Sequence, residues 1–369
     1  MMARKSHSLW TVIVVSALAL GGCAAVPLPV PSETPSASPA AVQLDCGLVL
    51  PVELAASALG LPIGTLFDPA AGDKSAGQPN TGAVMTAMFE TAVVAGGLVS
   101  CAYSAPDNGS GAQSDDGSRR LPNVTVRLLP NSAEEFALIE PDIDDGLSGL
   151  APVAVGDTAF VACHPPEHDS CRVEMLVGTT WVEASVTPRP QDEAFLAFAR
   201  ALALAVQSAA PITPAASPKE VSCDTLLDPS DLSDAVGIAN SESTDYGSFP
   251  SREAGIGTVA DRRAGLIRCG WLSSDPGGPS NDVLATILPN SHAAWAAALP
   301  DKVNSSTDFA PVTGLGDEAY AGCGQDTCEV AILSGDIWID LQNHAQPMGD
   351  LEGASSLAAT VLANYLANR

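Results

Sequence analysis

An ordered set of motifs occurs twice in this chain and constrains its fold more than any other feature. A Gly-Asp motif followed by two cysteines and a tryptophan spans residues 155–181 and again residues 314–338. The tetrapeptide Leu-Pro-Asn-Ser also occurs twice, at residues 129–132 and 288–291. At 369 residues the chain has room for two domains of ordinary size. The sequence therefore predicts two tandem copies of one domain.

The boundaries of the two copies follow from where the matches begin and end. The first copy covers residues 44–210 and the second covers residues 221–369. Residues 211–220 contain three prolines, which favours a linker rather than a packed element. We expect each copy to fold on its own, and a fragment of residues 221–369 to unfold cooperatively.

The N-terminal 22 residues have the features of a lipoprotein signal peptide. Arg4 and Lys5 precede an apolar run over residues 9–20, which is too short to span a bilayer comfortably. The run ends in Leu-Gly-Gly followed by Cys23, the pattern of a bacterial lipobox. The small residues give the signal peptidase access, and the thiol accepts a diacylglycerol. An ordinary secretory signal with an incidental cysteine is the alternative.

Residues 23–43 contain prolines, serines, threonines and alanines without apolar periodicity. Such a segment is extended and semi-rigid, so we interpret it as a tether. Its lipid would be the only link between the protein and the membrane. The expected location is the extracytoplasmic face of the cell membrane.

The charge of the chain limits its partners. Asp and Glu number 43 against 16 Lys and Arg, giving a formal net charge of −27. Such a chain repels nucleic acid and anionic head groups, so nucleic acid is excluded as a partner. The acidic residues are most simply read as a solvated surface.

Periodicity predicts an α+β fold for each copy. In the first copy, we predict strands over residues 97–103, 124–129, 158–163, 171–177 and 180–187, and the run at 124–129 alternates. Helical patterns occur at residues 52–59, 130–139 and 192–208. Residues 221–369 repeat this order, so each copy is read as α-β-β-α-β-β-β-α. Strands joined by hairpins form an antiparallel sheet, which the helices would flank.

Eight of the nine cysteines divide equally between the copies and predict two disulfides in each. Cys163 ends one predicted strand and Cys171 begins the next, and a hairpin brings such ends within disulfide reach. Cys323 and Cys328 lie at the same place in the second copy. The remaining cysteines then form the pairs Cys46–Cys101 and Cys223–Cys269.

The segment from Cys163 to Cys171 also permits a zinc-binding interpretation. It adds His164 and His168 to the two thiols, and these residue types are zinc ligands. The matched loop of the second copy has no histidine, however, whereas a disulfide accounts for both copies. We therefore predict no metal and no cofactor, and keep metal handling as an alternative.

No catalytic residue can be assigned. The nucleophile-elbow, Ser-x-x-Lys, His-Glu-x-x-His, Walker and dinucleotide patterns are all missing from the sequence. No histidine recurs at a matched position in both copies. The Asp-rich turn at residues 142–146 has Pro141 and Ile143 where a calcium loop needs oxygen ligands. A hydrolase whose site the sequence does not reveal stays an alternative.

One stretch, residues 81–98, is unusually apolar. It fits either a core helix that runs into the next strand or the wall of a pocket for a hydrophobic ligand, and we favour the core helix. Its counterpart at residues 252–263 is charged, so any such pocket would belong to the first copy alone. Tyr103, Trp181, Trp271 and Trp338 occupy matched strand positions and are expected in the core.

The order of motifs resembles the small extracytoplasmic lipoprotein domains of actinobacteria. In the second copy these motifs are Cys-Asp-Thr-Leu-Leu, Cys-Gly-Trp and Gly-Leu-Gly-Asp-Glu-Ala before a hairpin and a C-terminal helix. The resemblance implies a compact α+β sandwich in the cell envelope, and it brings no catalytic residues. We therefore expect a non-catalytic module that binds an envelope protein, glycan or lipid.

Overall fold

The computed structural model describes most of the chain from residue 46 onward. The described ranges are 46–66, 83–105, 121–144, 150–163, 169–208, 220–238, 241–247, 255–273, 282–305, 309–324, 327–344 and 350–369. The predicted signal peptide, Cys23, the tether and residues 211–219 of the linker lie outside these ranges. Residues Ala41–Arg369 form one compact unit.

The first copy contains a six-stranded antiparallel sheet with the order β1-β2-β6-β5-β4-β3. Its strands are β1 (Val99–Ser104), β2 (Asn123–Leu129), β3 (Ala151–Pro152), β4 (Thr158–Cys163), β5 (Cys171–Val177) and β6 (Thr180–Thr187). The last three coincide with the strands predicted over residues 158–163, 171–177 and 180–187. The short strand β3 was not predicted.

The second copy contains a seven-stranded antiparallel sheet with the order β7-β8-β9-β13-β12-β11-β10. Its strands are β7 (Ser241–Asp245), β8 (Ile267–Ser273), β9 (Asp282–Leu288), β10 (Ala310–Pro311), β11 (Glu318–Cys323), β12 (Cys328–Ser334) and β13 (Ile337–Asn343). Strands β8 to β13 repeat the order of β1 to β6. The predicted α+β class with two antiparallel sheets is confirmed, and β7 is an addition on the outer side of β8.

One face of each sheet is covered by helices of its own copy. On the first sheet these are α1 (Cys46–Val49), α2 (Val52–Leu59) and α5 (Asp192–Ser208). On the second sheet they are η2 (Cys223–Thr225), α6 (Pro229–Val236) and α9 (Leu351–Asn368). A further turn, η1 (Ile63–Thr65), follows α2. Helix α5 has the bounds predicted from the sequence. Its apolar residues Phe195, Phe198 and Leu202 recur on one side of the helix, and this side is buried.

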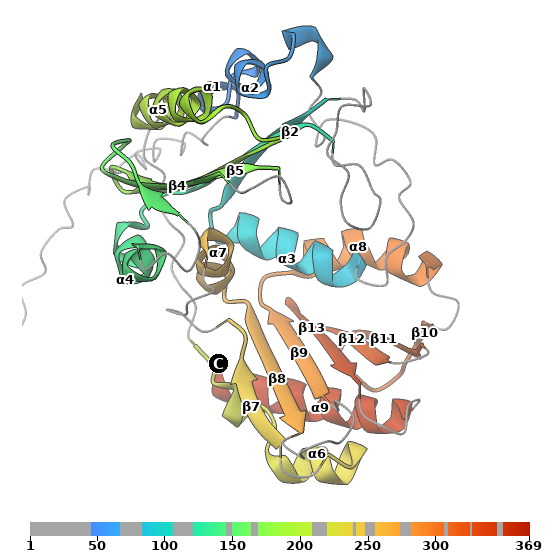
Figure 1. Cartoon of the computed structure of the whole chain (residues 1–369). Helices are drawn as coiled ribbons and strands as arrows, with labels where there is room; N and C mark the ends of the chain where they lie inside the picture. The colour runs from blue at the N-terminus through green and yellow to red at the C-terminus, as the bar shows by residue number, and fades with distance from the viewer. Residues whose placement is uncertain are drawn as a thin grey trace, which may run out of the picture. The chain divides into compact units, whose positions relative to one another are not determined.

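The other face of each sheet is shared between the copies; we call it the shared face, and it bears Trp181 in the first sheet and Trp338 in the second. Over the second sheet, α3 (Ala83–Ala95) of the first copy lies with α8 (His292–Ser305) (Figure 1). Over the first sheet, α7 (Ile256–Ala264) of the second copy lies with α4 (Ala133–Asp144). The two copies therefore exchange one helix each.

Matched residues of the exchanged helices make matched contacts. Met88 and Ala92 of α3 are buried among residues of the second sheet, and the corresponding Ile256 and Ala260 of α7 are buried against the first. The two helices also contact each other, and Gly96 lies so close to the backbone of Ala260 that an added Cβ would be 1.8 Å from its carbonyl oxygen. Only glycine fits there.

This exchange changes what each copy can do alone. Without α7, the first sheet would expose the apolar row around Trp181, and without α3 the second would expose the row around Trp338. Independent folding of each copy stays a prediction, which the exchanged helices count against. Residues 81–98 fit either a core helix or a pocket wall, and the structure shows a core helix, α3. This helix packs largely in the core of the second copy.

The four disulfides join the cysteines in the expected pairs. Cys46–Cys101 and Cys223–Cys269 tie the start of each copy to the first long strand of its sheet. Cys163–Cys171 and Cys323–Cys328 close hairpins between register partners. Four disulfides are typical of a protein that folds outside the cytoplasm. In the described ranges, no helix is both long and apolar enough to cross a membrane.

Candidate functional site

The repeated Gly-Asp motif has a structural role in both copies. Asp157 Oδ2 accepts a hydrogen bond of 2.6 Å from the backbone N–H of Gly178, and Asp317 Oδ2 accepts one of 2.6 Å from Gly335. Each carboxylate thereby fastens its loop to the turn of the following hairpin. The preceding Gly316 has φ of 58° and packs against the carbonyl of Leu333, which explains the glycine. The repeated Gly-Asp motif therefore stabilises the fold and does not indicate a reactive site.

The repeated Leu-Pro-Asn-Ser turn is also structural. Asn131 and Asn290 have φ of 52° and 54°, a left-handed conformation that asparagine tolerates. Ser132 is fully buried; its hydroxyl donates to the carbonyl of Leu129 and accepts from the backbone N–H of Trp181. The turn therefore joins β2 to α4 in a fixed geometry.

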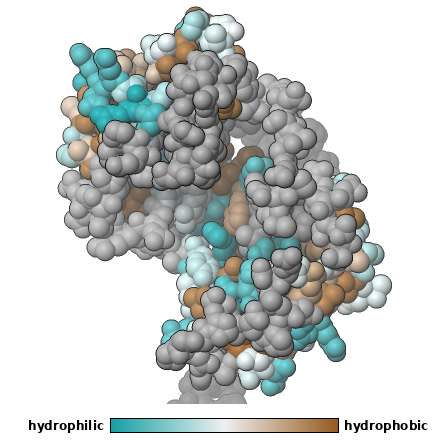
Figure 2. Space-filling view, turned by 45° about the vertical axis from the view of Figure 1, so that its right-hand side comes forward, coloured by the Kyte–Doolittle hydropathy of each residue, from teal (hydrophilic) through white to brown (hydrophobic). Residues whose placement is uncertain are grey.

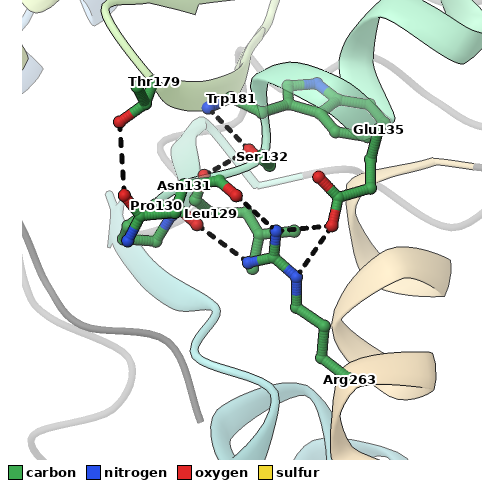
Figure 3. Close-up of polar contacts among 8 residues, drawn as sticks. All are labelled: Leu129, Pro130, Asn131, Ser132, Glu135, Thr179, Trp181 and Arg263. Carbon is green, nitrogen blue, oxygen red and sulfur yellow. Dashed lines mark hydrogen bonds and ion pairs between the residues drawn. The ribbon is translucent and has the colours of Figure 1, made fainter. Parts of the chain in front are cut away.

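In the first copy this turn receives an arginine from the second copy (Figure 3). Arg263, at the end of α7, donates 2.8 Å from Nη1 to the carbonyl of Pro130 and 2.7 Å from Nη2 to the carbonyl of Asn131. Its Nη2 and Nε also contact Glu135 Oε1, at 2.6 and 3.1 Å. The side chain is only 10% exposed. These contacts link the copies through a partly buried, charge-assisted network.

The corresponding turn of the second copy receives no matching arginine from the first copy. The residue of α3 that corresponds to Arg263 is Ala95, because Gly97-Leu98 matches Gly265-Leu266. A methyl group cannot donate to the turn at Pro289 and Asn290. The polar link of Figure 3 is therefore one-sided, although the helix exchange is mutual.

Beyond the row around Trp181, the shared face of the first sheet carries a charged cluster. Glu183 lies between two arginines: its Oε1 is 3.4 Å from Arg127 Nη1 and its Oε2 is 3.0 Å from Arg172 Nη2. Arg172 also pairs with Glu174, whose Oε2 accepts 2.7 Å from the Trp181 Nε1. The arginines are nearly half exposed, and the Glu174 side chain is 3% exposed.

Burial and the neighbouring Glu183 raise the pKa of Glu174 to about 7, against a smaller lowering by Arg172. The cluster therefore has two fixed positive charges beside a carboxylate that titrates near neutrality. Charged groups at the centre of a sheet face are unusual and make this cluster a candidate polar surface.

The matched positions of the second sheet have a different character. Thr286, Asp340 and Ala331 replace Arg127, Glu183 and Glu174 in the same register. The Trp338 Nε1 is buried and, among the described residues, has no hydrogen-bond partner. The arginine of this sheet stands one strand further out: the Arg268 guanidinium lies 4.6 Å from the ring centroid of Phe89 on α3.

Close to Arg268, α7 carries a partly buried acid. Burial raises the pKa of Asp261 to about 7, with a smaller lowering by Arg268. The Asp261 Oδ1 is buried and accepts no hydrogen bond from any described residue. The corresponding residue of α3 is Val93, so this acid is also specific to one copy.

The segment proposed for metal binding contains a disulfide. The sulfurs of Cys163 and Cys171 are bonded to each other, so in this oxidised state neither is a thiolate ligand. His164 and His168 lie outside the described residues. A carboxylate oxygen of Asp192 lies within 4.8 Å of these sulfurs, but Asp192 also pairs with Arg189 at 2.8 Å.

The other residues singled out from sequence take structural positions. Trp181, Trp271 and Trp338 are buried in the cores, and Tyr103 is half-buried beside its own core. Asp142 lies in α4, whereas Asp145 and Gly146 lie outside the described residues. Sequence reasoning missed Arg263 and Asp261, because a charged helix gives no sign of which sheet it will cover.

Comparison of the chain with protein-family models, with curated proteins and with solved structures finds no match.

Proposed function

We propose that this protein is a lipid-anchored envelope protein that serves as a non-catalytic interaction module. It would resemble the actinobacterial lipoproteins that carry small disulfide-bonded domains, here in two tandem copies. The lipobox ending at Cys23 and the Pro-rich tether support the anchor. The four disulfides support maturation outside the cytoplasm.

The observation that carries the interaction role is the division of labour among the repeated motifs. The Gly-Asp loop, the Leu-Pro-Asn-Ser turn and the aromatic pairs all bond within the scaffold. Several polar residues have no counterpart in the other copy, and they lie on the first sheet or on an exchanged helix. Examples are Glu174, Asp261 and Arg263. A scaffold that is repeated within the chain and carries one specialised sheet suits recognition of a partner.

Membrane fractionation of cells that produce Cys23→Ser tests the anchor. The wild-type chain should sediment with membranes, and the variant should be released or remain unprocessed. A variant that is processed and stays in the membrane would contradict a lipid anchor. Turnover of any substrate in a panel of esters, glycosides and peptides would contradict the non-catalytic role.

A further inference from the structure

The outer strands of the two sheets differ in how they are protected against further pairing. Edge strands expose unpaired N–H and C=O groups, and proteins protect them with short length, proline or charge. Strands β3 and β10 have two residues each, one of them proline. Strand β7 carries Glu242 and Asp245. Three of the four outer strands in the described sheets are therefore protected.

The fourth outer strand, β1, has none of these features. It has six residues, Val-Ser-Cys-Ala-Tyr-Ser, without charge or proline. Among the described residues, its only strand partner is β2. Its counterpart β8 is paired on both sides, with β9 and with β7. Among the described residues, no strand of the first sheet therefore takes the position that β7 takes in the second.

The hydrogen bonds show which groups of β1 face this position. Ala105 donates its N–H to Pro122, toward β2, so by alternation Ser100, Ala102 and Ser104 point away from β2. In the second sheet, Tyr246 donates to the carbonyl of Arg268, the counterpart of Ser100, from the outer side. The backbone N–H and C=O groups of β1 that point away from β2 therefore correspond to the groups of β8 that pair with β7.

Side chains of β1 also differ in burial from their counterparts in β8, which pairs with β7. Trp271, opposite β7, is 2% exposed, whereas the corresponding Tyr103 is only half-buried. Gly270 is buried under the ring of Tyr246, whereas the corresponding Ala102 is partly exposed. In Figure 2, the described residues on the face turned to the viewer mix hydrophobic and hydrophilic colours. Ala102 and Tyr103 of β1 are therefore more exposed than Gly270 and Trp271 of β8.

We infer that the outer edge of β1 binds an extended, positively charged segment of a partner protein, which pairs with β1 as β7 pairs with β8. Strand addition of this kind gives affinity through main-chain hydrogen bonds. A net charge of −27 repels a second copy of this chain and attracts a positive segment. The inference rests on the proposed function only in placing the partner in the cell envelope.

Residues 67–82 precede β1 as β7 precedes β8, and they lie outside the described ranges.

Hydrogen exchange of individual amides in the full-length, disulfide-bonded chain tests the inference. The probe is a short synthetic peptide of alternating threonine and valine with lysines at both ends. Without the peptide, Ala102 and Ser104 should exchange at least about tenfold faster than Gly270 and Leu272, which face β7. With the peptide, exchange at Ala102 and Ser104 should slow by about tenfold or more, while Tyr103 should not change.

Two variants at one position provide the matched control. Ala102→Pro removes the outward N–H without removing a bond to β2, and a proline is tolerated on the solvent side of an edge strand. Ala102→Val keeps the N–H. Peptide affinity should fall at least about tenfold in the proline variant and stay unchanged in the valine variant. Unchanged exchange in β8 would show that both variants are folded.

Three results would overturn the inference. Ala102 and Ser104 could exchange as slowly as Gly270 and Leu272 in the chain alone, which would mean that the edge is filled from within the chain or by a second copy. A peptide with glutamates in place of the lysines could bind equally well, which would remove the requirement for positive charge. The proline variant could bind like the wild type, which would exclude main-chain pairing at β1. Release of Cys23→Ser from membranes remains a separate result, so failure of the anchor and failure of the edge are distinguishable.

Discussion

The two copies share their scaffold to the level of individual contacts. Strands β1 to β6 and β8 to β13 have one order, and the buried tryptophan of each sheet meets an aromatic ring at right angles. Phe136 and Trp181 have ring centroids 5.5 Å apart at 83°, and Trp295 and Trp338 have theirs 5.5 Å apart at 88°. Such edge-to-face pairs stabilise a core beyond simple burial. These shared features are therefore the ones that specify the repeat.

Several side-chain differences between the copies lie on the exchanged helices and on the sheet surfaces that these helices cover. Glu174 bonds to Trp181 in the first sheet, whereas Ala331 leaves the same place apolar in the second. Arg263 links α7 to the first copy, whereas Ala95 of α3 offers no such link. The comparison teaches that the two copies share one order of six strands, and that they differ in the exchanged helices, in the surfaces these helices meet and in the added strand β7.

The largest expected difference separates the two kinds of disulfide. Cys223–Cys269 closes a separation of 46 residues, and Cys323–Cys328 closes one of 5. Replacing the first pair by serines should lower the free energy of unfolding by about 4 kcal/mol, and replacing the second pair by about 2 kcal/mol, because longer loops lose more chain entropy when closed. Urea titration measures both. Equal losses would mean that native-state packing, rather than loop length, sets the effect.

The partly buried Asp261 of α7 gives the next largest effect, with a defined pH dependence. The pKa of Asp261 is raised from 3.8 to about 7, so the folded chain holds an extra proton between these values. The free energy of unfolding therefore falls as the pH rises through this window, and the full cost is present above it. Asp261→Asn should be more stable than the wild type by about 2–4 kcal/mol above pH ~7.5. The gain should disappear below pH ~4.

An acid with the opposite shift serves as control for Asp261. Hydrogen bonds from the Ser230 side chain and from the backbone of Asp231 and Ser230 lower the pKa of Asp228, which caps α6. Asp228→Asn should therefore be less stable than the wild type near neutral pH, and the difference should shrink on acidification through the ordinary range of the carboxyl. Identical pH profiles for the two variants would contradict the assignment of Asp261 as a partly buried acid.

The link of Figure 3 should show the smallest of these effects. Arg263→Ala should lower the free energy of unfolding by about 2–3 kcal/mol, since Glu135 and two carbonyls lose a charged donor. The neighbouring Arg262 is the matched control, because it is 38% exposed and pairs with the largely exposed Glu220. Arg262→Ala should cost at most about 1 kcal/mol. Similar losses at both positions would show that the contacts of Arg263 with the turn add little.

Much of this fold could be predicted from sequence because its signals are local. Strands β4, β5 and β6 are short, mostly apolar runs joined by hairpins, α5 has a regular apolar period, and the cysteine spacing favours one pairing. Helix α7 could not be predicted in the same way, since its two arginines and Asp261 obscure the apolar positions. Strand β7 is too short and polar to stand out.

The helix exchange and the outer edge of β1 could not be predicted at all. Met88 and Ile256 are apolar at matched positions, which indicates burial, but burial against the neighbouring copy satisfies the same pattern as burial against their own. Among the described residues, β1 pairs only with β2, whereas β8 pairs with both β7 and β9. The residues of β1 alone do not predict this difference. Both features follow from tertiary topology.

The central claim is that the exchanged helices make the two copies one cooperative unit. Equilibrium urea unfolding of the disulfide-bonded chain, followed by hydrogen exchange of peptides from β5 and from β12, tests it most directly. Because each sheet depends on a helix of the other copy, both peptides should lose protection at one common urea midpoint. Two clearly separate midpoints, with one sheet intact while the other is unfolded, would contradict the claim.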